Sequence, residues 1–372
     1  MNIGILKENP SIERRVALTP AGVQSLVSAG HSVYIEQDAG DASHFANEKY
    51  EKVGATIVYT SDEIFGRSDI ILKISPPNET DCQRFEDEQT LLSFLHLPIA
   101  KPKTLELLQQ KKINAIGYEL IEDENGDLPI LQIMSEIAGQ MSIQIAARFL
   151  ESTNYGRGIV LGGITGIPPA TVVILGAGTV GTAATRIALG VGAEVIVLDK
   201  ELSRLRVLES RFNHRAVTAL MNEYNLQKAL QFADVVIGAV LIKGERAPHL
   251  VTSQMVQQMK PGSIILDISI DQGGCVATSR PTTLENPIYV HHNVIHYCVP
   301  NIPANVARTA TYGLTNAMLP YLLEMTSKGL HKAVAENKGL ARGVCTFQGK
   351  CTSESIAKRF ELESYDVQEL VK

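Results

Sequence analysis

The stretch from Val172 to Lys200 constrains the fold of this chain more than any other; it reads VVILGAGTVGTAATRIALGVGAEVIVLDK. An apolar β-branched strand is followed by a glycine-rich turn, a helix, and a second apolar strand that ends in an acid. The glycines have the spacing GxGxxG and are Gly176, Gly178 and Gly181. The first permits the tight turn, the second lets backbone approach a pyrophosphate, and the third lets helix and strand pack closely. The stretch therefore predicts a βαβ unit that binds a dinucleotide at a helix N-terminus.

Asp199 closes the second strand of this unit. A carboxylate at this place accepts hydrogen bonds from both ribose hydroxyls and repels a 2′-phosphate. The sequence therefore favours NAD over NADP as the cofactor. The alternative is a glycine turn in an α/β unit that binds no nucleotide, and the acid argues against it.

Strand and helix patterns alternate on both sides of this unit, as a doubly wound parallel sheet requires. Before it we expect strands at 2–8, 32–37, 69–77, 90–97 and 113–120 and helices at 19–30 and 102–112; after it we expect strands at 233–242 and 263–270 and a helix at 252–262. The predicted fold class is α/β, with two doubly wound Rossmann-like domains and a cleft between them.

The glycine motif decides which domain binds the cofactor. We expect an NAD-binding Rossmann domain at 129–302, which includes a connecting helix from Met134 to Ser152, and a substrate-binding domain at 1–128 and 303–372. The helical segment 307–330 is expected to return to the first domain.

Composition excludes several classes of function. The chain has 372 residues and a net charge of −6, so no overall field attracts nucleic acid or an anionic membrane. No apolar run approaches the ~20 residues of a membrane span, and no basic-then-apolar signal segment begins the sequence. Five widely spaced cysteines without a CxxC pair indicate reduced thiols and a cytoplasmic protein, and no HxxxH or CxxC spacing predicts a metal site.

Three charged or titratable residues near strand ends are candidates for the reaction site, because ligands of doubly wound sheets bind at the carboxyl ends of strands. Arg15 could clamp a substrate carboxylate with its fork, or be a surface arginine in an ion pair. His96 could relay a proton near neutral pH, or be a satisfied core histidine. Asp271 precedes two glycines and could approach a ligand, or be a turn-forming aspartate.

Taken together, the motifs resemble those of the alanine dehydrogenase family, which is related to the NAD-binding component of proton-translocating transhydrogenase. The resemblance covers nearly the whole chain and rests on segments in the same order: ERRVALTPAGV, LHL, MSEIAGQM, LGGITGIPPATVVILGAGTVG, IGAVLI, MKPGSIILDISIDQGGC, TSRPTT and GLTNAMLPY. It implies reversible, NAD-dependent oxidative deamination of L-alanine to pyruvate and ammonia in amino-acid catabolism, by a hexamer.

The resemblance also implies roles for individual residues. Arg15 corresponds to the carboxylate clamp, His96 to the acid/base partner of the carbonyl oxygen, and Asp271 to the acid that handles water and ammonia. It further implies that a set of residues lies beside the cofactor or substrate: Ser135, Ala239, Val240 and Asn301. A helix cap for Ser135 and a turn residue for Asn301 are the alternatives.

One stretch departs from the family pattern. The family usually reads Lys-x-Lys-Glu-Pro ahead of its Leu-His-Leu, with the second lysine at the substrate, whereas LKISPP here places Lys73 at the first lysine and Ser75 at the second. An insertion after this stretch could bring Lys73 into the site, or Ser75 could donate a neutral hydrogen bond. Gln132 and Ile133 stand where the family tends to have Ala-Pro.

Two functions follow from these patterns. The first is an NAD-dependent amino-acid dehydrogenase for L-alanine, slow or altered in substrate because of Ser75. The second is a non-catalytic or regulatory NAD(H)-binding protein of the same superfamily. Retention of Arg15, His96 and Asp271 favours the enzyme, because a binding module has no need of all three.

Overall fold

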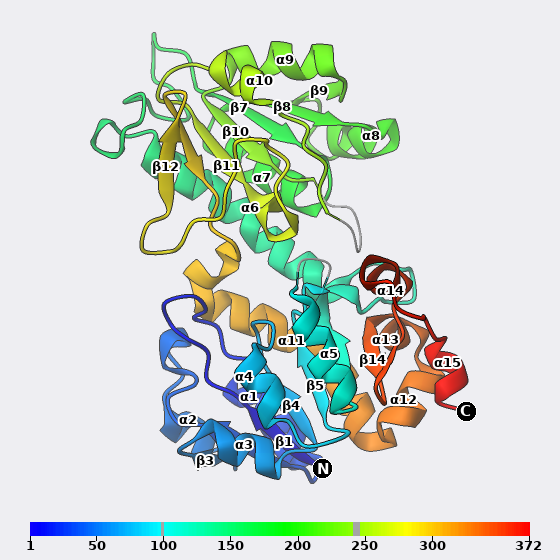
Figure 1. Ribbon diagram of the computed structural model, residues 1–372. Coiled ribbons are helices and arrows are strands. Elements are labelled where there is room, and N and C mark those ends of the chain that lie inside the picture. The colour runs from blue at the N-terminus through cyan, green and yellow to red at the C-terminus, as the bar shows by residue number, and fades with distance from the viewer. Residues whose placement is uncertain (98–99, 241–245) are drawn as a thin grey trace. The chain divides into compact units, whose positions relative to one another are not determined.

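The computed structural model describes residues 1–97, 100–240 and 246–372 and divides into two compact units. The first consists of Met1–Met134 and Ala304–Lys372, and the second of Ser135–Pro303. Each unit is built around a largely parallel sheet with flanking helices (Figure 1). The predicted two-domain α/β class is confirmed.

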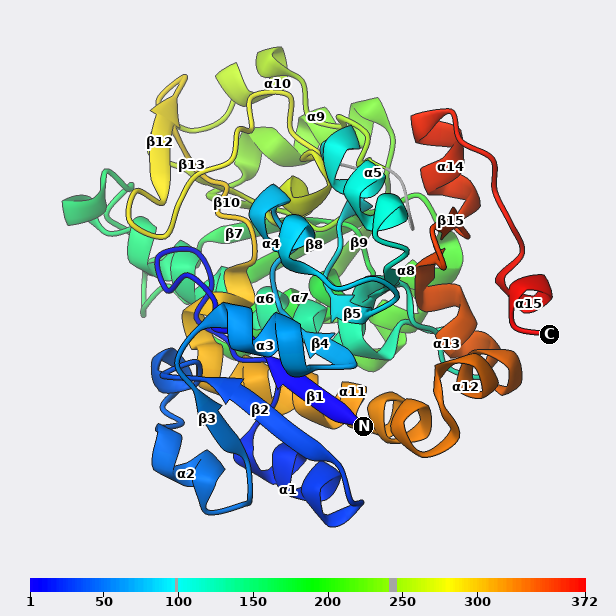
Figure 2. The same cartoon turned by 60° about the horizontal axis from the view of Figure 1, so that its bottom comes forward.

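The first unit contains a sheet of eight strands in the order β15-β14-β6-β5-β4-β1-β2-β3. The strands are β1 (Asn2–Ile5), β2 (Ser32–Glu36), β3 (Thr56–Val58), β4 (Ile70–Leu72), β5 (Thr90–Ser93), β6 (Asn114–Gly117), β14 (Val344–Phe347) and β15 (Lys350–Cys351). Strands β1 to β6 pair in parallel, and β1 to β5 are labelled in Figure 2. Strands β1, β4 and β5 are almost wholly buried, as expected of strands covered on both faces.

Helices complete the first unit. They are α1 (Pro20–Ser28), α2 (Asn47–Glu51), α3 (Ser61–Arg67), α4 (Glu79–Arg84), α5 (Pro102–Gln110), α11 (Ala307–Lys328), α12 (Leu330–Glu336), α13 (Lys338–Gly343), α14 (Glu354–Phe360) and α15 (Val367–Leu370).

The C-terminal segment returns to this first unit, as predicted. Two threonines of α11 accept hydrogen bonds from the backbone just before α1: Thr311 Oγ1 from Val16 N at 3.2 Å and Thr315 Oγ1 from Thr19 N at 3.0 Å. The hairpin of β14 and β15, which was not expected from the sequence, extends the sheet by antiparallel pairing of β14 with β6.

The second unit contains a sheet of seven strands in the order β12-β13-β11-β10-β7-β8-β9. The strands are β7 (Thr171–Leu175), β8 (Glu194–Asp199), β9 (Val217–Leu220), β10 (Val235–Gly238), β11 (Ile264–Asp267), β12 (Ile288–His291) and β13 (Val294–Tyr297). Only β12 pairs antiparallel among the described strands of this sheet. The helices are α6 (Pro129–Phe149), α7 (Thr179–Gly190), α8 (Leu202–Arg211), α9 (Glu223–Phe232) and α10 (Ser253–Gln257), of which α6 begins in the first unit.

Several expected elements have different bounds. The connecting helix begins at Pro129, because proline suits the first turn of a helix, and ends at Phe149. The strand expected at 263–270 ends at Asp267 and continues as a 3₁₀ helix, Ile268–Gln272, because the buried Asp267 carboxylate accepts bonds from backbone nitrogens further along the chain and turns it back. The strand expected at 233–242 is limited to β10, and residues 241 and 242 lie outside the described residues.

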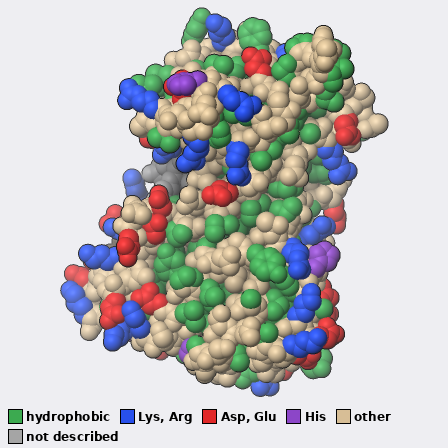
Figure 3. All heavy atoms as spheres, turned by 180° about the vertical axis from the view of Figure 1, so that it is seen from behind, with side chains coloured by type: hydrophobic (Ala, Val, Ile, Leu, Met, Phe, Trp, Pro, Cys, Tyr) green, Lys and Arg blue, Asp and Glu red, His purple; other side chains and the backbone are tan. Residues whose placement is uncertain are grey.

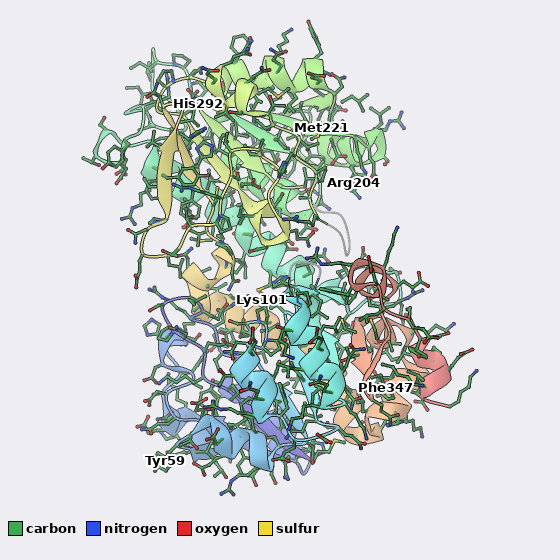
Figure 4. The ribbon with its side chains drawn as sticks, viewed as in Figure 1. Tyr59, Lys101, Arg204, Met221, His292 and Phe347 are labelled. Carbon is green, nitrogen blue, oxygen red and sulfur yellow. The ribbon has the colours of Figure 1, made fainter. Side chains whose placement is uncertain are left out.

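The buried His296 on β13 should make the stability of the fold depend on pH, because its pKa is lowered in the folded chain. Burial lowers the pKa of His296 to about 4 from 6.5, and the neighbouring His291 and His292 act in the same direction. Its Nε2 lies 2.8 Å from Thr278 Oγ1 and its Nδ1 lies 3.0 Å from the Val294 oxygen. Figure 4 labels His292, one of the two neighbours that lower the His296 pKa further.

The unfolded chain takes up a proton on this imidazole below pH 6.5, whereas the folded chain does so only near pH 4. We therefore expect the free energy of unfolding to fall as the pH drops through this window, by up to about 3 kcal/mol from this group. Urea unfolding at a series of pH values checks this, and His296→Gln should flatten the curve between pH 6.5 and 4. An equal slope in the variant would contradict the assignment to His296.

Candidate active site

The glycine turn of the second unit has the geometry that its motif predicts. Gly176 has φ +110°, and a Cβ there would lie 2.4 Å from the Ala239 oxygen; a Cβ on Gly181 would lie 1.8 Å from the Gly176 oxygen. Only glycine fits at these two positions. Gly178 precedes α7, and a Cβ there would meet nothing within 4 Å. The backbone amides at the start of α7 can therefore receive a phosphate group.

Asp199 is anchored against this turn. It is 4% exposed; its Oδ2 accepts a hydrogen bond from Ala177 N at 2.7 Å and its Oδ1 one from Glu201 N at 2.8 Å. Its backbone oxygen accepts one from the nitrogen of Met221, which is labelled in Figure 4, at 2.9 Å. The carboxylate thus has a set orientation beside the glycine turn, which suits recognition of ribose hydroxyls.

Two other predicted residues of the second unit are brought together. Asp271 lies in the 3₁₀ helix after β11, and its Oδ1 accepts a hydrogen bond from Asn301 N at 3.0 Å. Asn301 has φ +60°, a left-handed conformation that asparagine tolerates better than most residues. Ser135 is half-buried in the interior of α6, so it is not a helix cap.

Arg15 in the first unit is buried and not a surface residue. It is 3% exposed, and Glu13 binds its fork with two bonds of 2.8 Å, from Nε to Oε1 and from Nη2 to Oε2. The Nη1 atom donates to Met134 Sδ at 3.1 Å, and the guanidinium lies 5.4 Å from the centre of the Phe94 ring. Glu13 therefore orients the guanidinium through its Nε–Nη2 edge.

His96 lies beside the same aromatic ring. Its imidazole stacks on Phe94, with ring centres 6.0 Å apart and planes at 12°. Its φ of +45° is unusual for a residue other than glycine, and Glu119 holds this conformation by accepting bonds from His96 N at 2.7 Å and Leu95 N at 3.2 Å. Backbone strain of this kind clusters at functional sites. Phe94 thus brings the predicted cation and the predicted proton-transfer group together.

Lys73 has its ammonium group in a buried ion cluster. The residue is 8% exposed, and its Nζ lies 3.1 Å from Glu8 Oε2 and 3.8 Å from Asp81 Oδ2. The other oxygen of Glu8 accepts bonds from Ile74 N at 2.7 Å and Ser75 N at 3.0 Å. Lys73 therefore balances two carboxylates next to the end of β4, and the half-buried Ser75 follows it with its backbone held by Glu8.

The sequence analysis missed the acids that position these groups. Glu8, Glu13 and Glu119 are buried, and each accepts hydrogen bonds from the backbone or side chains of the site segments. Glu8 and Glu119 each follow an apolar strand within three residues of its end, which is the same signal that selected His96. Such acids act by holding in place the groups proposed to contact the substrate, so a pattern of substrate-contacting residue types does not select them.

Comparison with known proteins places both units in one family. The family model for the "Alanine dehydrogenase/PNT, N-terminal domain" matches residues 4–138, and that for the C-terminal domain matches residues 142–354. The chain belongs to the alanine dehydrogenase/PNT family. The resemblance inferred from its motifs is confirmed.

Relatives in this family match over their full length. The alanine dehydrogenase of Methanococcus maripaludis is 46% identical over 363 residues, 97% of each chain. That of Mycobacterium tuberculosis is 43% identical over 357 residues, 96% of each chain. A solved L-alanine dehydrogenase has a TM-score of 0.91 at 40% identity and covers 97% of this chain and 99% of its own.

A more distant solved structure shares the fold. The transhydrogenase of Sinorhizobium meliloti has a TM-score of 0.80 at 22% identity, over 95% of this chain and 100% of its own. Within residues 1–97, 100–240 and 246–372, no helix combines the length and apolar character needed to cross a membrane.

Proposed function

We propose that this protein is an NAD-dependent alanine dehydrogenase that converts L-alanine and water to pyruvate and ammonium and also catalyses the reverse reductive amination. The observation that carries the proposal is the placement of Arg15 and His96 on the same ring of Phe94, in a chain that matches alanine dehydrogenases end to end. The non-catalytic, regulatory alternative is not favoured by these relatives.

Each proposed residue has a chemical task. Arg15, oriented by Glu13, holds the substrate carboxylate. NAD, held by the second unit, would supply the hydride acceptor for the Cα–H bond of the substrate. His96 gives or takes the proton of the oxygen that forms on the 2-carbon when water adds to the imine. Asp271 accepts a proton from the attacking water and donates a proton to the departing ammonia. The nicotinamide nucleotide is held by the glycine turn, Asp199, Ser135 and the backbone of residues 239 and 240.

The protein is further proposed to be a cytoplasmic homo-oligomer, a hexamer by family likeness, whose small-molecule partners are an amino acid, a 2-oxo acid and ammonia. Three large apolar side chains on the loop before β7 support an interface, since such groups on a surface mark interaction sites: Val160, Ile164 and Ile167 are 63%, 65% and 59% exposed. Hydrophobic side chains also lie on the molecular face shown in Figure 3.

The direct test of the function is NADH consumption with pyruvate and ammonium, repeated with glyoxylate and with 2-oxobutyrate. Consumption with pyruvate that exceeds that with the other two acids supports an alanine dehydrogenase. No consumption with any of them, despite NADH binding, would instead favour a binding protein.

Cofactor choice is tested at Asp199. We expect the unmutated protein to bind NADH more tightly than NADPH. Asp199→Ala should lower the ratio of the NADPH dissociation constant to the NADH dissociation constant by about tenfold, because it removes a negative charge next to the 2′-phosphate position. NADH affinity should also fall, since the carboxylate anchors the glycine turn through Ala177 N. Fluorescence titration with both nucleotides gives the ratio, and equal affinities in the unmutated protein would contradict the assignment.

A further inference from the structure

A buried hydroxyl two residues before Asp271 binds the loop that follows β10. Ser269 is 6% exposed, and its Oγ donates to the Val240 oxygen at 2.8 Å and accepts from Val240 N at 3.0 Å. One side chain thus satisfies both backbone groups of one residue. The bond ties residue 240 to the 3₁₀ helix that carries Asp271.

The backbone of residues 238–240 is also confined on both sides. A Cβ on Gly176 would lie 2.4 Å from the Ala239 oxygen, so the glycine turn packs directly against this backbone. A Cβ on Gly238 would lie 2.5 Å from Cys275 Sγ and 3.1 Å from Asp267 Oδ1. The glycine turn and Cys275 therefore confine the backbone of residues 238–240. The Ser269 hydroxyl fixes this segment at Val240, the end that leads away from the sheet.

Asp267 closes the other side of this arrangement. Its Oδ2 accepts bonds from Cys275 N at 3.0 Å and Val276 N at 3.1 Å, which turns the chain back after Asp271. Burial raises the pKa of the Asp267 carboxyl, and these donors act against that rise. Three alternate residues thus bind three different segments: Asp267 binds the chain at 275 and 276, Ser269 binds the loop after β10, and Asp271 binds Asn301 N.

We propose that Ser269 is a positioning residue for hydride transfer, whose hydroxyl holds the backbone of Ala239 and Val240 in register with Asp271. This inference rests on the proposed function, in which residues 239 and 240 contact the cofactor. Ser269 itself touches protein backbone and acts through it. Loss of the hydroxyl frees this edge of the dinucleotide site without removing any group that contacts the substrate.

The test compares Ser269→Ala with Ser263→Ala. Ser263 is fully buried just before the opposite end of β11, and its Oγ has no hydrogen-bond partner among the residues that the structure describes. Both variants remove one buried serine hydroxyl. NADH affinity is measured by fluorescence titration, kcat with alanine by NADH formation, and the isotope effect on kcat with alanine deuterated at Cα.

For Ser269→Ala we expect NADH affinity to weaken about fivefold and kcat to fall about tenfold with a larger isotope effect, because a misplaced nicotinamide slows hydride transfer. Ser263→Ala should match the unmutated protein, and Ser269→Thr, which keeps the hydroxyl, should recover most of the NADH affinity. A purely structural role for Ser269 would lower the unfolding temperature alone.

Unchanged NADH affinity in Ser269→Ala overturns the inference, as does an equal loss in Ser263→Ala. An unmutated protein that binds NADH but oxidises no alanine contradicts the proposed function instead. The titrations still decide in that case whether Ser269 positions the cofactor loop.

Discussion

Replacement of His96 by asparagine is expected to lower kcat for alanine oxidation by about 10²- to 10⁴-fold, the usual contribution of a general acid or base. Asparagine removes the imidazole and tolerates the left-handed backbone at φ +45°. The bonds to Glu119 come from backbone nitrogens, so they persist in the variant. Steady-state rates with alanine and NAD, and with pyruvate, ammonium and NADH, measure the loss in both directions.

His44 offers a matched control. It is also left-handed, at φ +61°, but it is exposed, and Lys49 and Arg308 donate hydrogen bonds to its backbone oxygen. His44→Asn should therefore leave kcat unchanged. NADH affinity and unfolding temperature should stay the same in both variants. A His96→Asn protein with more than a tenth of the original kcat would show that another group transfers the proton.

The geometry of the glycine turn and of Asp199, the proposed cofactor half of the site, could be predicted from the sequence because most of its constraints are local. Gly181 is required by its contact with the Gly176 oxygen in the same short strand–turn–helix segment, and Gly176 by the φ of +110° in the turn, so the spacing alone predicts the turn. The contact of Gly176 with the Ala239 oxygen comes from a distant segment and could not be predicted in this way. Asp199 ends the strand that pairs directly with the first, so its place next to the turn follows from the βαβ connection.

The substrate half depends on contacts between distant segments, which spacing does not reveal. Arg15 and His96 meet at Phe94 only because β5 and the loop after β1 approach each other in the fold. The hairpin of β14 and β15 was not predicted because both strands are short and because β14 pairs with β6, a strand more than two hundred residues earlier in the chain.

Ser75→Lys is expected to raise kcat for alanine by about 10²-fold, since a fixed cation that stabilises a developing oxyanion contributes about 10²- to 10³-fold. The structure supports this expectation through Lys73, whose ammonium lies between Glu8 and Asp81 and so balances charge inside the fold. A serine hydroxyl at position 75 supplies at most a neutral hydrogen bond. NADH affinity should remain unchanged, because the residues proposed to bind the cofactor belong to the other unit. Rates with saturating alanine and NAD measure the gain.

Lys73→Met separates the two lysine assignments. The Lys73 ammonium is buried, so its loss leaves Glu8 and Asp81 uncompensated and should lower the free energy of unfolding by about 3–5 kcal/mol. Ser75→Lys should retain its higher kcat regardless of this stability effect. If Lys73 is instead the substrate lysine, the folded Lys73→Met variant will lose alanine turnover while it still binds NADH. Ser75→Lys will then give no higher kcat, since the second ammonium would compete with the first for the same carboxylates. That outcome would move the substrate lysine by two residues and leave the reaction class as proposed.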